Sequence, residues 1–118
     1  MTLGQLETRL RKFALGMPEA DEAFPWGERA IRVKKKAFLF MRLEGKDLSF
    51  SVKLSESRQS ALALDFTEPT HYGLGKHGWV TARVTKASRA DAEGFEEWIA
   101  ESYRLVAPQK LARAVVAE

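Results

Sequence analysis

Hydrophobic residues near the N-terminus recur every three or four positions, as they do on one face of an α-helix. This spacing is followed by Leu3, Leu6, Leu10 and Phe13. Thr2 and Gln5 stand at the spacing of a capping box, in which each side chain bonds the backbone N–H of the other residue. We therefore predict a helix over about the first fourteen residues.

Glycine and proline break the helical pattern between residues 16 and 27. We expect an irregular connection there, with its acidic side chains in solvent. These acids are Glu19, Asp21 and Glu22. The connection ends in Phe24 and Trp26 beside a proline and a glycine, and we expect the two rings to plug the edge of the core.

Between residues 29 and 53 the hydrophobic period changes to two, which is typical of strands with one buried face. Three strands are predicted, around residues 31–33, 38–43 and 48–52. The steps between them, at 34–36 and 44–47, are short enough for hairpin turns, so the strands should pair antiparallel as a meander.

The second half of the chain predicts two further helices and a strand. Ser55 can cap a short helix that ends at about Leu64, and residues 65–76 look irregular. Alternation returns over residues 79–84, with Trp79, Thr81 and Arg83 on the polar side of the strand. Ser88 and Asp91 begin a final helix with one apolar face, which Pro108 interrupts before a last turn packs back through Leu111, Val115 and Val116.

These elements predict an α+β fold, a two-layer sandwich in which an antiparallel sheet packs against helices in the order α-β-β-β-α-β(β)-α. The chain of 118 residues is 45% hydrophobic and 30% charged, which fits a single domain over residues 1–118. It contains no cysteine, which excludes disulfides and thiol catalysis and favours a reducing cytoplasm. It also lacks an apolar run long enough to cross a membrane.

Positive charge is concentrated in two blocks. Residues 29–53 carry eight basic and two acidic side chains, and residues 71–89 carry four basic side chains and no acidic one. If the two blocks share a surface, that surface attracts an anionic partner more strongly than the net charge of +3 suggests.

The first block predicts a basic finger. Arg32 and Lys34 point away from the apolar side of their strand, while Lys35 and Lys36 occupy the exposed tip. Such a hairpin can lie along a phosphate backbone and release the counterions condensed there. The simpler interpretation of this segment alone is a solvated turn whose lysines keep the sheet soluble.

The second block is a glycine-rich loop over residues 71–79 that matches no nucleotide-binding fingerprint. Lys76 and His77 supply hydrogen-bond donors, and Tyr72 and Trp79 offer stacking faces. The loop could hold a small ligand, or its aromatic rings could simply cover the core. His71 and His77 lack a nearby third ligand for a metal, and no catalytic constellation is found, so we expect neither an enzyme nor a cofactor.

Carboxylates in the final helix lie opposite its apolar stripe and are most simply a solvated face. They are Glu93, Glu96, Glu97 and Glu101.

Several segments together resemble the MmcQ/YjbR-like family. The resemblance covers nearly the whole chain and is carried by residues 24–27, 31–33, 36–38, 53–54, 76–80 and 101–106. It implies an α+β fold similar to secretion chaperones and sometimes compared with the frataxin-like CyaY fold. Family members are small bacterial proteins described as DNA-binding, through a proposed double-wing arrangement of β-elements.

The family pattern matches Lys36, Lys53, Lys76 and Trp79. Charge counting adds Arg29, Arg32, Lys34 and Lys35, and His77 and Arg83 complete the set of candidate DNA contacts. Ser102 and Tyr103 also match the family, but we interpret them as structural, with the tyrosine hydroxyl bonded inside the fold. We expect non-specific DNA binding; the alternative is a protein-interaction or chaperone-like module that binds no nucleic acid.

Overall fold

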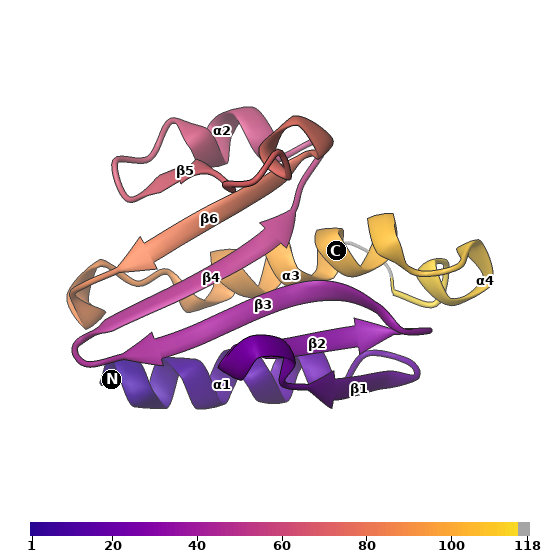
Figure 1. Cartoon of the computed structure of the whole chain (residues 1–118), viewed down its shortest axis with the longest axis horizontal. Coiled ribbons are helices and arrows are strands. Elements are labelled where there is room, and N and C mark those ends of the chain that lie inside the picture. The colour runs from indigo at the N-terminus through magenta and orange to yellow at the C-terminus, as the bar shows by residue number, and fades with distance from the viewer. Residues whose placement is uncertain (116–118) are drawn as a thin grey trace.

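Six antiparallel strands form one sheet in the order β1-β2-β3-β4-β6-β5, with helices packed on one face (Figure 1). The computed structural model describes residues 1–115, except for the side chain of Trp26. The strands are β1 (Ala20–Ala23), β2 (Arg29–Val33), β3 (Lys36–Glu44), β4 (Asp47–Lys53), β5 (Thr67–Pro69) and β6 (Trp79–Val84). The helices are α1 (Leu3–Leu15), α2 (Arg58–Leu62), α3 (Ala92–Val106) and α4 (Gln109–Ala112), with 3-10 turns η1 (Pro25–Gly27), η2 (Gly75–His77) and η3 (Ala87–Arg89).

The core lies between the sheet and the two long helices, α1 and α3. The predicted stripe of α1 is buried at Leu6 and Leu10, and the capping box of Thr2 and Gln5 is present. In α3, Phe95, Ile99 and Tyr103 face the sheet. The α+β two-layer architecture is therefore as predicted, because both helices bury one apolar face against the apolar side of the sheet.

The predicted meander of β2, β3 and β4 is confirmed. The first turn is tighter than expected, because Lys36 already pairs with Val33 and only Lys34 and Lys35 form the loop. Both loop residues have positive φ, 50° and 68°. Such angles are usual for Asn-Gly in a type I′ turn, so the hairpin places two lysines where the sequence gives no turn signal.

The prediction of an irregular connection over residues 16–27 is wrong. Residues 20–23 form the edge strand β1, which pairs antiparallel with β2. A strand of four residues with two carboxylates shows no clear alternation of polar and apolar residues, which is why the pattern missed it. The acids of this segment do not simply face solvent, because each contacts a cation of α1, β2 or the β2–β3 turn.

Several smaller features, including element boundaries, also differ from the predictions. Residues 65–76 contain the short edge strand β5. The first residue of α2 is Arg58 rather than one next to Ser55, and Asp91 rather than Ser88 caps α3. Phe24 is exposed and does not plug the core. The C-terminal turn is confirmed at Leu111 and Val115, which pack against the core, whereas Val116 lies outside the described residues.

Ser102 and Tyr103 are structural, as expected. The Tyr103 hydroxyl donates to the Pro18 carbonyl oxygen at 2.7 Å, and the burial of Tyr103 raises the pKa of its phenol. Ser102 Oγ donates to the Phe38 carbonyl at 2.6 Å and accepts from the Lys53 N–H at 2.9 Å. Phe38 sits where the β2–β3 register shifts, so a side chain from α3 satisfies backbone groups that lack a partner in the ladder.

Glu22 connects α1 to the edge of the sheet. Its carboxylate accepts two hydrogen bonds from Arg11 of α1 at 2.9 and 3.0 Å and another from Arg29 of β2. These two guanidinium groups, Arg11 first, lower the pKa of Glu22 although its partial burial acts in the opposite direction.

We expect Glu22→Gln to lower the free energy of unfolding by about 1–2 kcal/mol at pH 7. Because the folded-state pKa lies below the unfolded value, the ionised carboxylate stabilises the fold above the unfolded pKa, and this contribution is lost as the pH falls through the folded pKa. Urea unfolding at pH 7 and pH 3 measures the difference. The gap between wild type and variant should be smaller at pH 3 than at pH 7, while Glu97→Gln on the exposed surface of α3 should cost little at either pH.

Candidate nucleic-acid interface

The sheet has a second face, turned away from α1 and α3, which we call the open face. Side chains directly opposite each other on paired strands share a face, so the register identifies its members. Phe40 pairs with Ser51, which pairs with Thr81, and Arg42 pairs with Ser49, which pairs with Arg83. The open face therefore carries one row of aromatic and hydroxyl groups and one row with two arginines.

A groove of about 720 Å³ follows this face. Its floor consists of the two rows of β3, β4 and β6. One wall contains Pro25, in η1, and Glu28, just after it, and the other contains His71, Tyr72 and Leu74. The walls come from chain segments far apart in sequence, which only the sheet order brings together.

Hydroxyl groups on the groove floor are linked to one another. Thr81 Oγ1 lies 2.7 Å from Ser51 Oγ and 2.9 Å from Thr70 Oγ1. Three hydroxyls supply three protons, and the two hydrogen bonds between them use only two. The row therefore retains donor and acceptor capacity for another group.

Three of the predicted DNA contacts are neutralised by acids of the N-terminal segment. Arg29 pairs with Glu22, and its guanidinium also lies over the Phe24 ring at 5.2 Å. The other two pairs are Arg32 with Asp21, at 2.9 Å, and Lys34 with Glu19, at 2.7 Å. The basic finger is thus weaker than its sequence indicates, because β1 and the turn before it bring carboxylates to the same edge.

Four other predicted lysines form no ion pair within residues 1–115. Together with His77 they lie at one end of the sheet, which we call the basic end. Its members are Lys35, Lys36, Lys53, Lys76 and His77. The register places them there, because Lys53, the last residue of β4, pairs with Trp79, the first residue of β6, while β3 begins at Lys36.

Trp79 is less exposed than predicted, and Arg83 does not lie with the other predicted DNA contacts. Trp79 is 8% exposed and packs on Phe40, with the ring centroids 5.4 Å apart, so little of its surface is free for stacking. Arg83 is exposed but lies toward the other end of β6 from the basic end, near Arg42. No local sequence signal singles out Arg42, since its place beside Arg83 depends on register.

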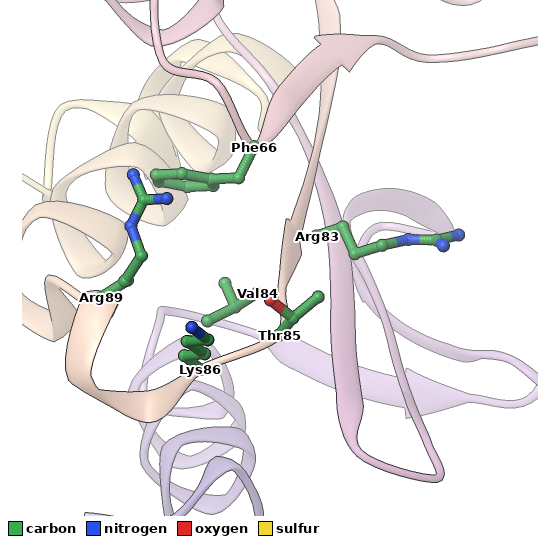
Figure 2. Close-up of a pocket in the computed structure, with 6 residues that line it drawn as sticks. All are labelled: Phe66, Arg83, Val84, Thr85, Lys86 and Arg89. Atoms are coloured by element: carbon green, nitrogen blue, oxygen red, sulfur yellow. The ribbon is translucent and has the colours of Figure 1, made fainter.

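A second pocket, of about 20 Å³, lies beside Phe66 (Figure 2). Figure 2 shows the Arg83 side chain directed away from Lys86 and Arg89, although all three line the pocket. Arg89 in turn pairs with Asp65 at 2.9 Å. The three cations therefore do not converge on one anion.

The carboxylates of α3 are not all a solvated face, which corrects the prediction. Glu101 accepts hydrogen bonds from the Ser55 N–H at 2.7 Å, the Ser57 N–H at 3.2 Å and the Ser57 hydroxyl at 2.6 Å. Glu96 pairs with Arg9 of α1. Both glutamates hold α3 to neighbouring segments.

In residues 1–115, no three His, Cys, Asp or Glu side chains are grouped as metal ligands would be.

Comparison with known proteins agrees with this architecture. The family model named YjbR matches residues 15–105. The solved structure of protein DR2400 from Deinococcus radiodurans, with a domain named DUF419, superposes with a TM-score of 0.68 at 23% identity, covering 89% of this chain and 78% of that one. A protein from Pseudomonas syringae gives a TM-score of 0.66 at 15% identity, with coverages of 84% and 97%. No curated protein matches. Both structural similarities concern the fold.

Within the part of the chain described here, no helix is long and apolar enough to cross a membrane.

Proposed function

Since the chain belongs to the YjbR family, we propose that it is a nucleic-acid-binding protein, not an enzyme, that holds the phosphates of duplex DNA with little readout of base sequence. The observation that carries this proposal is the basic end. Four lysines from three separate parts of the chain lie there without carboxylate partners among residues 1–115. An unpaired lysine can contact a phosphate directly, whereas a paired lysine must first break its contact with the carboxylate.

The β2–β3 hairpin and the segment around η2 would be the two wings of the double-wing arrangement. The hairpin contributes Lys35 and Lys36, and η2 contributes Lys76 and His77. Lys53 lies between them at the end of β4. All three sources of charge are thus presented by β-elements and their turns, on one end of a rigid sheet.

The proposed binding is weak and sensitive to salt. A handful of lysines that neutralise phosphates and release counterions gives a Kd on the order of 10⁻⁴ to 10⁻⁶ M at physiological salt. A lysine that contacts a phosphate reads no base edge, so affinity should depend little on DNA sequence.

Fluorescence anisotropy with a labelled 20-base-pair duplex, at 50 and 200 mM salt, tests the proposal. We expect binding at the lower salt and a steep loss at the higher salt, with similar affinity for two unrelated sequences. Absence of binding at 50 mM salt would contradict the proposal and favour a protein-interaction module.

A further inference from the structure

We propose that the groove on the open face binds an unpaired nucleotide of a single strand, with the base against Tyr72 and the neighbouring phosphates on Arg42 and Arg83. This inference rests on the proposed function and assigns it a preferred substrate, single-stranded nucleic acid or a duplex with an unpaired end. It uses the groove of about 720 Å³, which the basic end does not include.

Tyr72 supplies the stacking surface. Its side chain is 101% exposed, although an aromatic ring of this size usually buries much of its area. Its backbone has a φ of 60°, which a non-glycine residue rarely adopts. This turn presents the ring in the wall of the groove, opposite the wall formed by Pro25 and Glu28.

Phe40 gives the groove floor a second aromatic surface. It is partly exposed and is supported from the side by the buried Trp79. A base in a duplex has both its faces covered by neighbouring bases, so only an unpaired base can place a face against such rings. The aromatic content of the groove therefore favours a single strand over a duplex.

Two arginines stand at one end of the groove. Arg42 and Arg83 are both paired in register with Ser49, on either side of it. Arg83 forms no ion pair with any residue of the described chain. Arg42 pairs with Glu44 at 3.1 Å, so a phosphate at Arg42 would have to displace that carboxylate. Guanidinium groups in this arrangement fit the phosphates next to a stacked base.

The groove also contains carboxylates, which distinguish it from a simple track for phosphates. Glu28 and Glu68 line it, and Glu68 lies 3.2 Å from His71. A carboxylate repels a phosphate but accepts hydrogen bonds from the amino groups of bases. The acids and the linked hydroxyls of Ser51, Thr81 and Thr70 therefore suit the polar edge of a base, with the phosphates at the arginine end.

The test compares a labelled single strand of 12 cytidines, (dC)12, with a blunt 20-base-pair duplex by anisotropy. Tyr72→Ala should weaken (dC)12 binding about tenfold, within the range of roughly 5- to 150-fold for the loss of one stacking ring, and should change duplex affinity less than twofold. The matched control is Phe24→Ala, which removes another exposed ring outside the groove lining and should change neither affinity. Arg83→Gln should lower the salt slope for (dC)12 by about 0.7, whereas Arg89→Gln should not.

No loss of (dC)12 binding in Tyr72→Ala would overturn the inference and leave the proposed duplex binding unaffected. Equal loss of both substrates would also overturn it, because the ring would then contribute to duplex binding as well. Wild-type protein that binds neither substrate would overturn the proposed function as well. Displacement of (dC)12 by micromolar deoxycytidine monophosphate would assign the groove to a free nucleotide and would also overturn its assignment to a strand.

Discussion

Replacing Lys35, Lys36 and Lys76 with glutamine is expected to weaken duplex binding about a hundredfold or more at 0.1 M salt. Each lysine–phosphate contact adds about 0.9 to the salt slope, so the triple variant should lose about 2.7 from the slope of log K against log salt. The three side chains are exposed, in the β2–β3 turn, at the first residue of β3 and in η2, so the fold should remain intact. Anisotropy titrations between 50 and 200 mM salt measure both quantities.

The chain offers a matched control for this experiment. Lys12, Lys46 and Lys86 are also exposed and are not members of the basic end. Lys46, in the β3–β4 turn, and Lys86, after β6, lie at the other end of the sheet, and Lys12 lies on α1 in the helical layer. Their triple replacement with glutamine removes the same net charge. If both triple variants lose the same affinity, the net charge of the protein and not the basic end determines binding, and the proposed interface is wrong.

Ser102→Ala is expected to lower the free energy of unfolding by about 3 kcal/mol. The side chain is 0% exposed and satisfies two backbone groups, the Phe38 carbonyl and the Lys53 N–H. Removing one oxygen creates little empty volume, but it leaves both groups without this partner, at about 1–3 kcal/mol each. Urea unfolding measures the loss, which corresponds to a fall in Tm of about 10 °C.

Two variants show whether the loss comes from these hydrogen bonds. Tyr103→Phe removes only the hydrogen bond to Pro18 and should cost about 1 kcal/mol. Ser88→Ala, on an exposed serine of η3, should cost almost nothing. A loss below 0.5 kcal/mol for Ser102→Ala, about the smallest net contribution of one such bond, would show that the backbone at the β2–β3 bulge finds other partners.

Elements with a strong hydrophobic period were predictable from the sequence. The stripe of α1, the meander and the alternation of β6 all follow from which positions must be buried. The edge strands β1 and β5 were not, because a short edge strand buries little and its residues show no clear period. The N-cap of α3 was misplaced for a related reason: Ser88 and Asp91 are both good capping residues, and packing decides between them.

The candidate site was only partly predictable. The family pattern and charge counting together found the lysines of the basic end. Charge counting also included Arg29, Arg32 and Lys34, whose carboxylate partners lie in the missed strand or just before it. Local sequence shows which side chains are charged, whereas pairing with an acid depends on the register between strands. Arg42 was not predicted for the same reason: it lies beside Arg83 on the open face only because β3 pairs with β4 and β4 pairs with β6.

The most direct measurement of where phosphates bind is a titration of ¹⁵N-labelled protein with a short duplex, followed by backbone amide chemical shifts. We predict that the largest changes fall at residues 34–36, at Lys53 and at residues 76–79, and that they vanish when salt is raised to 0.5 M. Changes centred on the exposed surfaces of α1 and α3, or an unchanged spectrum at low salt, would contradict a nucleic-acid interface at the basic end.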